Sequence, residues 1–273
     1  MSVSSELPED GSAQPGRESD EDDSEVLLSV RRALMVLQVF SAENPSLSLA
    51  DIAKMIGVSR GTTRRILITF EQLGFVRQTG RQFTLTPRVL RLGYAYVSSL
   101  PFWERAQPHL RELADAVEES SSIAVLDGSD IAYVARVPSR RNLPTALTVG
   151  SRLPAHATSM GHVLLAALPP DELRNYFDTV HLQRLTSKTI IDKERLSTEL
   201  EKVRRTGYSI ANGERDLGIR SAAAPIVDRS GQVIAALNVS SAPGRVSMAE
   251  MRARIVPQVV ATAKIISDEL GYA

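Results

Sequence analysis

Residues 48–73 read SLADIAKMIGVSRGTTRRILITFEQL, and this stretch decides the fold of the N-terminal part of the chain. Ser48, with Asp51 three positions later, forms a Ser-x-x-Asp capping signature at the start of a helix that Gly57 ends. Ser59 then caps a second helix, which continues to the end of the stretch. Two helices joined by a turn of about three residues that contains glycine predict a helix-turn-helix.

The segments on either side of this stretch complete the motif. Apolar residues recur near a period of 3.6 from Val26 to Phe40, which predicts a preceding helix. Two short alternating segments, 75–78 and 81–85, flank Thr79-Gly80 and predict a β-hairpin wing. We therefore expect a winged helix-turn-helix domain over residues 26–86.

The second helix of the motif carries a basic face, opposite an apolar face that includes Thr63, Leu67 and Leu73. In a helix-turn-helix the N-terminal half of this helix enters the major groove, where arginine can bond guanine bidentately. We expect bases to be read by Arg60 and Arg64, with Thr62 and Arg65 next. Contacts to phosphates or the minor groove are expected from Ser59, the wing residues Arg77 and Arg81, and Arg31. A solvated basic helix is the ordinary alternative, which the two caps, the turn and the wing disfavour.

The charges of the chain are segregated, although 32 basic and 32 acidic residues give a net charge of zero. Residues 1–25 hold nine acids and one arginine, a net charge of −8, whereas residues 26–98 hold ten bases and three acids, a net charge of +7. A compact basic segment is typical of a region that meets a polyanion. The acidic tail, residues 1–25, has almost no large apolar residues, so we expect it to be disordered and to compete weakly for the basic segment.

Length and composition exclude several classes of protein. A chain of 273 residues fits two domains, and the absence of cysteine excludes disulfides, thiolate catalysis and iron–sulfur clusters. The longest apolar runs, 163–168 and 233–237, are far shorter than the roughly 20 residues of a membrane span, and the acidic start does not resemble a signal peptide. The four histidines lack metal-ligand spacing, and no glycine-rich phosphate loop occurs. We expect a cytoplasmic protein without membrane contact, metal or cofactor.

The rest of the chain divides into a connecting helix, expected over residues 87–103, and a second domain over residues 104–273. Strand patterns occur at 122–126, 131–137, 208–211, 222–227 and 233–240, and 146–149 is a further candidate strand. Helical patterns occur at 104–119, 158–168, 169–177, 192–205 and 247–270. Hairpin-rich strands with helices before and after them predict an antiparallel α+β domain.

Over about residues 26–270 the chain resembles the IclR family of bacterial transcriptional regulators. The family's characteristic stretches stand as VGSRLPAHATSMG at 149–161, Gly207-Tyr208, Gly218-Ile219-Arg220 and Ala224-Pro225-Ile226. Four further stretches resemble the subgroup that controls aromatic-acid catabolism (PcaR, PcaU and PobR type): LTPRVL at 85–90, GYAY at 93–96, YVARVP at 133–138 and ALNVS at 236–240. The resemblance implies a C-terminal GAF-like effector domain and dimers or tetramers on a palindromic operator. It also implies an effector such as protocatechuate, 4-hydroxybenzoate or β-ketoadipate.

A ligand site is expected where Thr158 opens an apolar helix, because the free N–H groups and dipole of a helix start suit a carboxylate. By resemblance, the effector cavity is lined by Ser159, Met160, Ala211, Ser221, Asn238 and Ser240. Family members that take small keto acids can carry an acidic residue in place of Ala211 and serine in place of Asn238, so these differences favour a different or larger ligand. Candidate charge partners for an organic acid are Arg152, His156 and Arg220.

Two alternatives from other classes stay open. The pattern Ala157-x-Ser159-x-Gly161 is close to a nucleophile elbow, and Asp171 and Asp178 precede His181 in the order of a serine hydrolase that would use Ser159. The first glycine of the elbow is missing and no continuous apolar strand precedes it, so we expect no enzyme. The other alternative is an oligomeric DNA-binding or signalling scaffold that does not respond to a small molecule.

Overall fold

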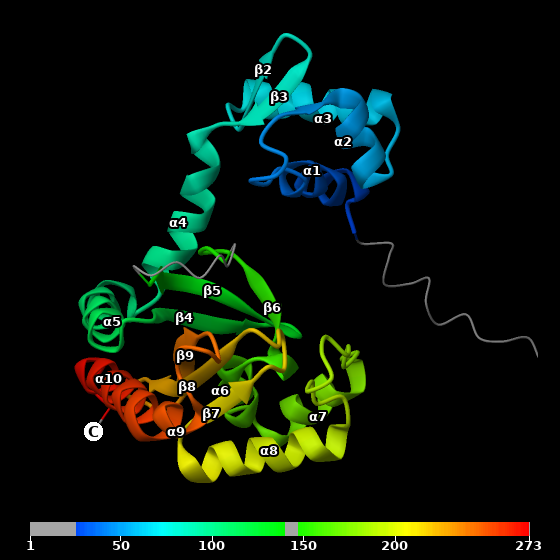
Figure 1. Ribbon diagram of the computed structural model, residues 1–273. Helices are drawn as coiled ribbons and strands as arrows, with labels where there is room; N and C mark the ends of the chain where they lie inside the picture. The colour runs from blue at the N-terminus through cyan, green and yellow to red at the C-terminus, as the bar shows by residue number, and fades with distance from the viewer. Residues whose placement is uncertain (1–25, 140–146, 273) are drawn as a thin grey trace, which may run out of the picture. The chain divides into compact units, whose positions relative to one another are not determined.

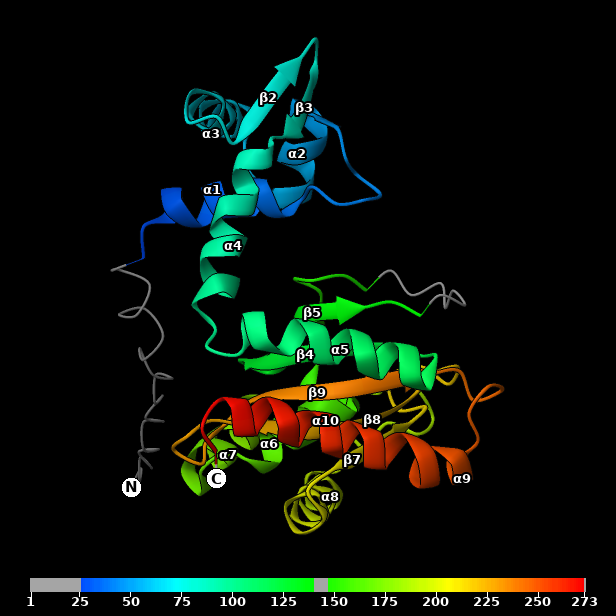
Figure 2. The same cartoon turned by 90° about the vertical axis from the view of Figure 1, so that its left-hand side faces the viewer.

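The computed structural model describes residues 26–139 and 147–272, which form two compact units that divide between Leu92 and Gly93 (Figures 1 and 2). Each unit has its own buried apolar core. The tail that the sequence predicts to be disordered, residues 1–25, lies outside the described residues. Among the helices that the structure describes, none combines the length and the apolar character needed to cross a bilayer.

The N-terminal unit is a winged helix-turn-helix, as expected. Its helices are α1 (Leu28–Gln38), α2 (Leu49–Ile56) and α3 (Arg60–Gln72), and its strands are β1 (Leu47–Ser48), β2 (Val76–Thr79) and β3 (Gln82–Leu85), in the order β1-β3-β2. The predicted caps are present: Ser48 and Asp51 form a reciprocal capping box, and Gly57 ends α2 in the left-handed conformation. The Ser59 hydroxyl accepts a hydrogen bond from the Thr62 N–H at 3.3 Å and so begins α3.

The core of this unit fills the space between the three helices and the wing. Thr63 and Leu67 of α3 are fully buried, as their helical spacing predicts. Leu73 was expected on the same face, and that expectation is wrong, because α3 ends at Gln72 and the Leu73 side chain is 50% exposed. The sequence pattern also missed β1, which is only two residues long and pairs Leu47 with Phe83.

The segment expected as one connecting helix consists of two elements. A 3₁₀ turn, Pro87–Val89, is capped by the Thr86 hydroxyl and leads into α4, Leu90–Ser99. The helix ends before Pro101, because proline disfavours helical backbone in the residue that precedes it. The next helix, α5 (Trp103–Val117), belongs to the C-terminal unit.

The C-terminal unit is a six-stranded antiparallel sheet with helices on both faces (Figure 2). In spatial order the strands are β6 (Arg152–Pro154), β5 (Asp130–Val137), β4 (Ser120–Asp127), β9 (Val233–Ser241), β8 (Arg220–Val227) and β7 (Ser209–Asn212). One face is covered by α5 and by the C-terminal helical segment, which comprises α9 (Met248–Glu250), a π-helical stretch (Met251–Ile255) and α10 (Val256–Glu269). The other face is covered by a 3₁₀ turn (Ala155–Ala157) with α6 (Ser159–Ala166), and beyond them α7 (Pro170–Thr179) and α8 (Lys193–Thr206).

Small side chains let α6 lie close to the sheet. Strand residues alternate between the two faces, and those facing α6 include Ala124, Ala223 and Ala236. Within α6 itself, a side-chain carbon at Gly161 would overlap the carbonyl group of Ala155, so only glycine fits there. This close packing fixes the start of α6 against the ends of β7, β8 and β9.

The candidate strand at 146–149 is not a strand where the structure describes it. Residue 146 is outside the described residues, and Val149-Gly150 forms a turn closed by a hydrogen bond from the Ser151 N–H to the Thr148 carbonyl. The edge strand comes just after this turn, as β6, and it contains Pro154. Proline has no N–H group to donate to a neighbouring strand, and an edge strand has one side without a neighbour, so an edge position tolerates proline.

Candidate ligand cavity and nucleic-acid interface

The N-terminal unit presents unpaired positive charge along α3. Arg60, Arg64 and Arg65 are exposed, and within the described residues none of their guanidinium groups has a hydrogen bond or an ion pair. The three acids within residues 26–92 each accept local hydrogen bonds: Glu43 from Ser41, Asp51 from Ser48 and Glu71 from Gln78. No described carboxylate therefore neutralises the arginines of α3, and the surface suits a polyanion.

The other predicted DNA contacts lie on three different elements. Arg77 is exposed on β2, Arg81 is exposed in the turn of the wing, and Arg31 is exposed on α1. Ser59 is exposed, but its hydroxyl is engaged with the backbone and side chain of Thr62 at the start of α3. A phosphate contact from Ser59 would have to share that hydroxyl with the cap.

A small cavity, with an enclosed volume of about 40 Å³ and an opening to solvent, lies on the α6 face of the C-terminal sheet. Its walls come from the strands β5, β7, β8 and β9, from the residues just before α6 and from the loop that joins β7 to β8. The lining residues are Tyr133, Leu147, Leu153, Ala157, Thr158, Ala211, Gly213, Glu214, Arg215, Asp216, Ile219, Ser221, Asn238 and Ser240. Apart from Tyr133, seven of these fourteen residues are polar or charged, so the cavity combines apolar surface with groups that can orient a ligand.

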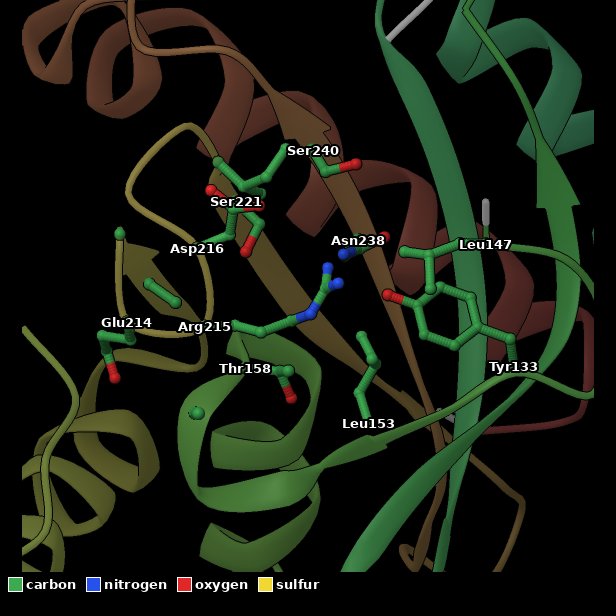
Figure 3. A pocket seen from close by; sticks show the side chains of 14 residues that line it. Tyr133, Leu147, Leu153, Thr158, Glu214, Arg215, Asp216, Ser221, Asn238 and Ser240 are labelled. Atoms are coloured by element: carbon green, nitrogen blue, oxygen red, sulfur yellow. The ribbon is translucent and has the colours of Figure 1, made fainter. Parts of the chain in front are cut away.

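The Arg215 side chain extends across this cavity toward Asn238 and Tyr133 (Figure 3). Within the described part of the chain its guanidinium has no hydrogen bond and no carboxylate partner. A guanidinium in a partly enclosed cavity offers paired N–H donors that match a carboxylate. Arg215 is therefore placed to bind an acidic ligand.

Two further polar groups face the same space. Asn238 is 4% exposed, and its Oδ1 atom has no hydrogen-bond partner among the described residues. A buried polar atom without a partner costs free energy unless a ligand or water satisfies it. Burial raises the pKa of Tyr133, so its hydroxyl stays protonated and can donate a hydrogen bond.

The loop that carries Arg215 is held in place through its carbonyl groups. The Thr186 hydroxyl donates to the Gly213 carbonyl at 2.6 Å, and the Thr189 hydroxyl donates to the Glu214 carbonyl at 2.6 Å. The Gly213 N–H donates to the Ile219 carbonyl at 2.9 Å and closes the loop. These bonds fix the backbone on either side of the arginine.

Glu214 lies on the other side of this loop, next to a buried histidine. Its Oε2 atom is 3.5 Å from Nε2 of His162, and Nε2 donates to the His156 carbonyl at 2.8 Å. Burial, together with the charge of Glu199, raises the pKa of Glu214 to about 7. Burial lowers the pKa of His162, so the pair consists of a neutral imidazole and a carboxyl group that ionises near neutral pH.

Comparison with known proteins identifies the chain. A model of the IclR helix-turn-helix domain matches residues 29–80, and a model of the C-terminal part of the bacterial transcriptional regulator IclR matches residues 94–268. The chain belongs to the IclR family. The family consists of bacterial transcriptional regulators, so the expected function, a DNA-binding transcriptional regulator, is confirmed.

Individual IclR-family relatives are similar over most of the chain. The Pca regulon regulatory protein of Pseudomonas putida is 40% identical over 249 residues, which cover 91% of this chain and 86% of that protein. A crystal structure of a transcriptional regulator from Rhodococcus sp. RHA1 has 44% identity and a TM-score of 0.80, covering 90% of this chain and 99% of that one.

A third relative is a double mutant of the inducer-binding domain of the PobR transcription factor from Acinetobacter, in complex with 3-hydroxybenzoic acid. It has 32% identity and a TM-score of 0.57, and covers 60% of this chain and 96% of that one. The expected resemblance to regulators of the Pca and Pob type is confirmed by these proteins.

In this IclR-family structure, the predicted ligand residues separate into two groups. Ala211, Ser221, Asn238 and Ser240 line the cavity. The other five predicted residues lie outside the lining. Ser159 bonds the Ser221 hydroxyl at 2.7 Å, and Met160 is buried in the core. The three candidate charge partners are engaged elsewhere: Arg152 with Asp127 and Asp130, His156 with the Gln183 carbonyl, and Arg220 with Asn212 and the Val246 carbonyl.

Strand alternation explains why two of the predicted charge partners face elsewhere. Ser221 lines the cavity, so Arg220, one position before it on β8, lies on the opposite face of the sheet. In the same way Leu153 lines the cavity and Arg152, its neighbour on β6, does not. The cation of the cavity is Arg215, which the sequence did not indicate.

The lining residues that the sequence analysis did not predict include Tyr133, Glu214 and Arg215. A usable signal was present in Gly213-Glu-Arg-Asp-Leu-Gly218, a charged loop bracketed by glycines between two strands. Such a loop has no periodicity, however, so the direction of its side chains cannot be derived from spacing.

The geometry around Ser159 also bears on the hydrolase alternative. Ser159 is fully buried, and its hydroxyl bonds Ser221 rather than any described histidine. Histidines lie three positions away on either side: His156 bonds the Gln183 carbonyl, and His162 bonds the His156 carbonyl and the Ser209 hydroxyl. The relatives named above are transcriptional regulators.

Proposed function

We propose that this IclR-family regulator binds a hydroxylated aromatic monocarboxylate in its C-terminal cavity and that the ligand changes its affinity for operator DNA. The observation that carries this proposal is Arg215, whose guanidinium extends across the cavity and has no described partner. The unsatisfied Oδ1 atom of Asn238 supports it, because a ligand hydroxyl can donate to this atom. We propose no catalytic step.

The lining favours an aromatic acid over an aliphatic diacid. Tyr133, Leu147, Leu153 and Ile219 supply apolar surface for a ring. Arg215 is the one cation among the described lining residues, and Asp216 adds a negative charge, so the second carboxylate of β-ketoadipate would have no described cationic partner. A monocarboxylate such as 4-hydroxybenzoate or protocatechuate needs one cation. The PobR domain bound to 3-hydroxybenzoic acid supports this class of ligand.

On the DNA side, we propose that Arg60, Arg64, Thr62 and Arg65 read bases and that Ser59, Arg77, Arg81 and Arg31 contact the backbone or minor groove. We also propose that the protein acts in the cytoplasm as a dimer or tetramer on a palindromic operator, with two winged domains about 34 Å apart or a multiple of it. The domain boundaries we propose are residues 26–86, 87–103 and 104–273. Control of aromatic-compound catabolism genes follows from the same proposal.

The first test is binding of the full chain to its own upstream DNA, followed by fluorescence anisotropy at fixed salt. Each titration is repeated with 4-hydroxybenzoate, protocatechuate, benzoate and β-ketoadipate, and direct ligand affinities are measured by calorimetry. We expect specific DNA binding that one hydroxylated aromatic acid shifts. A ligand can shift DNA affinity only by its differential affinity for the two states.

Other outcomes decide between the alternatives. If β-ketoadipate shifts DNA binding and the aromatic acids do not, the proposed ligand class, an aromatic monocarboxylate, is wrong. If DNA binding is specific and calorimetry detects binding of none of the acids, the result favours the alternative of a DNA-binding scaffold that does not respond to a small molecule. Hydrolysis of a generic ester that is lost in Ser159→Ala would support the hydrolase alternative.

A further inference from the structure

We propose that the acidic segment 18–25 docks on the groove between α1 and α3 and competes there with DNA. The family models match from residue 29 onward, so this segment lies outside the part of the chain that they cover. The inference concerns the DNA-binding unit alone and does not depend on the ligand proposed for the cavity.

The groove combines an apolar floor with a cationic rim. Val30 and Leu34 of α1 and Ile66 and Phe70 of α3 line it, together with Arg32 and Arg65. Val30 and Leu34 are each 52% exposed, so the groove is open to solvent. Thr62 and Arg65, which we expect to read bases, also line this groove, so an occupant would cover part of the DNA-reading face.

The charges of the two partners are complementary. Segment 18–25 reads ESDEDDSE and contains six acids in eight residues. Arg60, Arg64 and Arg65 on α3 have no described carboxylate partner, and the acids within residues 26–92 accept local hydrogen bonds. The acidic segment can therefore supply the counter-charge that the described residues do not.

The chain geometry brings the two partners together. Helix α1 begins at Leu28, and Ser29 and Val30 already line the groove, so segment 18–25 enters the chain within a few residues of the rim. Eight extended residues span up to about 26 Å, whereas the 13 residues of α3 span about 20 Å. A segment tethered at this distance has an effective concentration of the order of millimolar.

The expected consequence is a salt-dependent reduction of DNA affinity. DNA phosphates must displace the acidic segment from the arginines before DNA can bind. The displaced segment then binds cations from solution, so fewer cations are released in total when DNA binds. Attraction between exposed charges is screened within about 10 Å at 0.1 M salt, so the competition weakens as salt rises.

The first experiment compares the full chain with a variant in which the six acids are replaced by amides (Glu18→Gln, Asp20→Asn, Glu21→Gln, Asp22→Asn, Asp23→Asn, Glu25→Gln). We expect the variant to bind a non-specific duplex about fivefold more tightly at low salt, the size that a few exposed ion pairs supply. The log–log salt dependence should become steeper, and the two proteins should converge at high salt. A matched pair of three-charge variants, Asp22→Asn/Asp23→Asn/Glu25→Gln and Glu6→Gln/Glu9→Gln/Asp10→Asn, tests whether position matters.

The second experiment distinguishes docking from simple repulsion of DNA. The chain has no cysteine, so Ser19→Cys carries a single nitroxide label and Ser4→Cys a distant control label. We expect the label at position 19, but not at position 4, to broaden amide signals of α3, and added DNA or salt to remove the broadening. Unchanged DNA affinity in the six-amide variant, or tighter binding without broadening in α3, would overturn the docking proposal.

Discussion

Glu214 and Arg215 are consecutive in the chain, but their side chains lie on opposite sides of the loop between β7 and β8 (Figure 3). Both residues line the cavity, but the Arg215 side chain extends across it, whereas Glu214 Oε2 lies 3.5 Å from Nε2 of the buried His162. The threonine bonds to the carbonyls of Gly213 and Glu214 hold the backbone between them. A single loop therefore carries both the proposed ligand anchor, Arg215, and a buried acid, Glu214. A substitution at either residue can be tested for its effect on the other.

Replacing Arg215 with glutamine should weaken carboxylate binding by about tenfold to a hundredfold, because a hydrogen bond to a charged group contributes about 1.5 to 3 kcal/mol. The measurement is calorimetry with 4-hydroxybenzoate and with its uncharged carboxamide. The affinity for the carboxamide should change little, because an uncharged group gains little from the positive charge of Arg215. Arg174→Gln, at an exposed arginine of α7, is the matched control and should leave both affinities unchanged. Equal losses for the acid and the amide would contradict a charge-specific role.

Thr189 should position Arg215 without touching the ligand. Thr189→Val removes the hydroxyl that donates to the Glu214 carbonyl and accepts from the Leu185 and Thr186 N–H groups, so we expect several-fold weaker acid binding and about 1 to 3 kcal/mol lower stability. Thr189→Ser keeps the hydroxyl and should restore both. In an Arg215→Gln background Thr189→Val should have no further effect on acid affinity. An additive loss there would show that Thr189 acts independently of the arginine.

The elevated pKa of Glu214 predicts a specific pH dependence of stability. The folded carboxyl has a pKa of about 7 and the unfolded one about 4.5, so the folded state binds more protons between these values. The free energy of unfolding should therefore fall as pH rises from about 4.5 to about 7, by an amount of the order of 3 kcal/mol, and be constant above that range. Glu199 strengthens this effect, whereas Lys202 opposes it.

The measurement is urea unfolding of the wild-type chain and Glu214→Gln between pH 5 and pH 8. Burial lowers the pKa of His162, which removes stability as pH falls below about 6.5 in both proteins, so this contribution cancels in the difference. We expect the stability of the wild type relative to Glu214→Gln to decrease from pH 5 to about pH 7 and then to level off. A pH-independent difference would mean that the folded carboxyl titrates normally.

Local signals made the N-terminal unit predictable from the sequence. The caps at Ser48 and Ser59 and the glycine after α2 act within four residues, and all are present in the structure. Strand β1 was not predictable, because its two residues are defined by pairing with Phe83 and Gln82, which lie more than 30 positions away. Features set by distant partners carry no local pattern.

The cavity shows the same division between local and long-range information. The family resemblance indicated the polar residues Ser221, Asn238 and Ser240; they lie on strands, where a period of two places Asn238 and Ser240 on one face. Arg215 lies in a loop, and its direction depends on the bonds from Thr186 and Thr189, about 26 residues earlier in the chain. The sequence could therefore indicate the strand walls of the cavity but not its cation.

The reading helix and the wing should respond differently to loss of an arginine. Arg64→Ala should cost about 1 to 3 kcal/mol on the specific operator and relax base preference at one position, because a bidentate contact to guanine is lost. Arg77→Ala should weaken binding to all sequences alike and reduce the salt slope by about 1, because a phosphate contact is lost. Both side chains are exposed and have no hydrogen bond within the described residues, so neither change should alter stability. Anisotropy titrations on the operator, on single-base variants of it and on a random duplex, at three salt concentrations, separate the two cases. A loss for Arg64→Ala that is equal on every sequence would make Arg64 a phosphate contact and remove it from the residues that read bases.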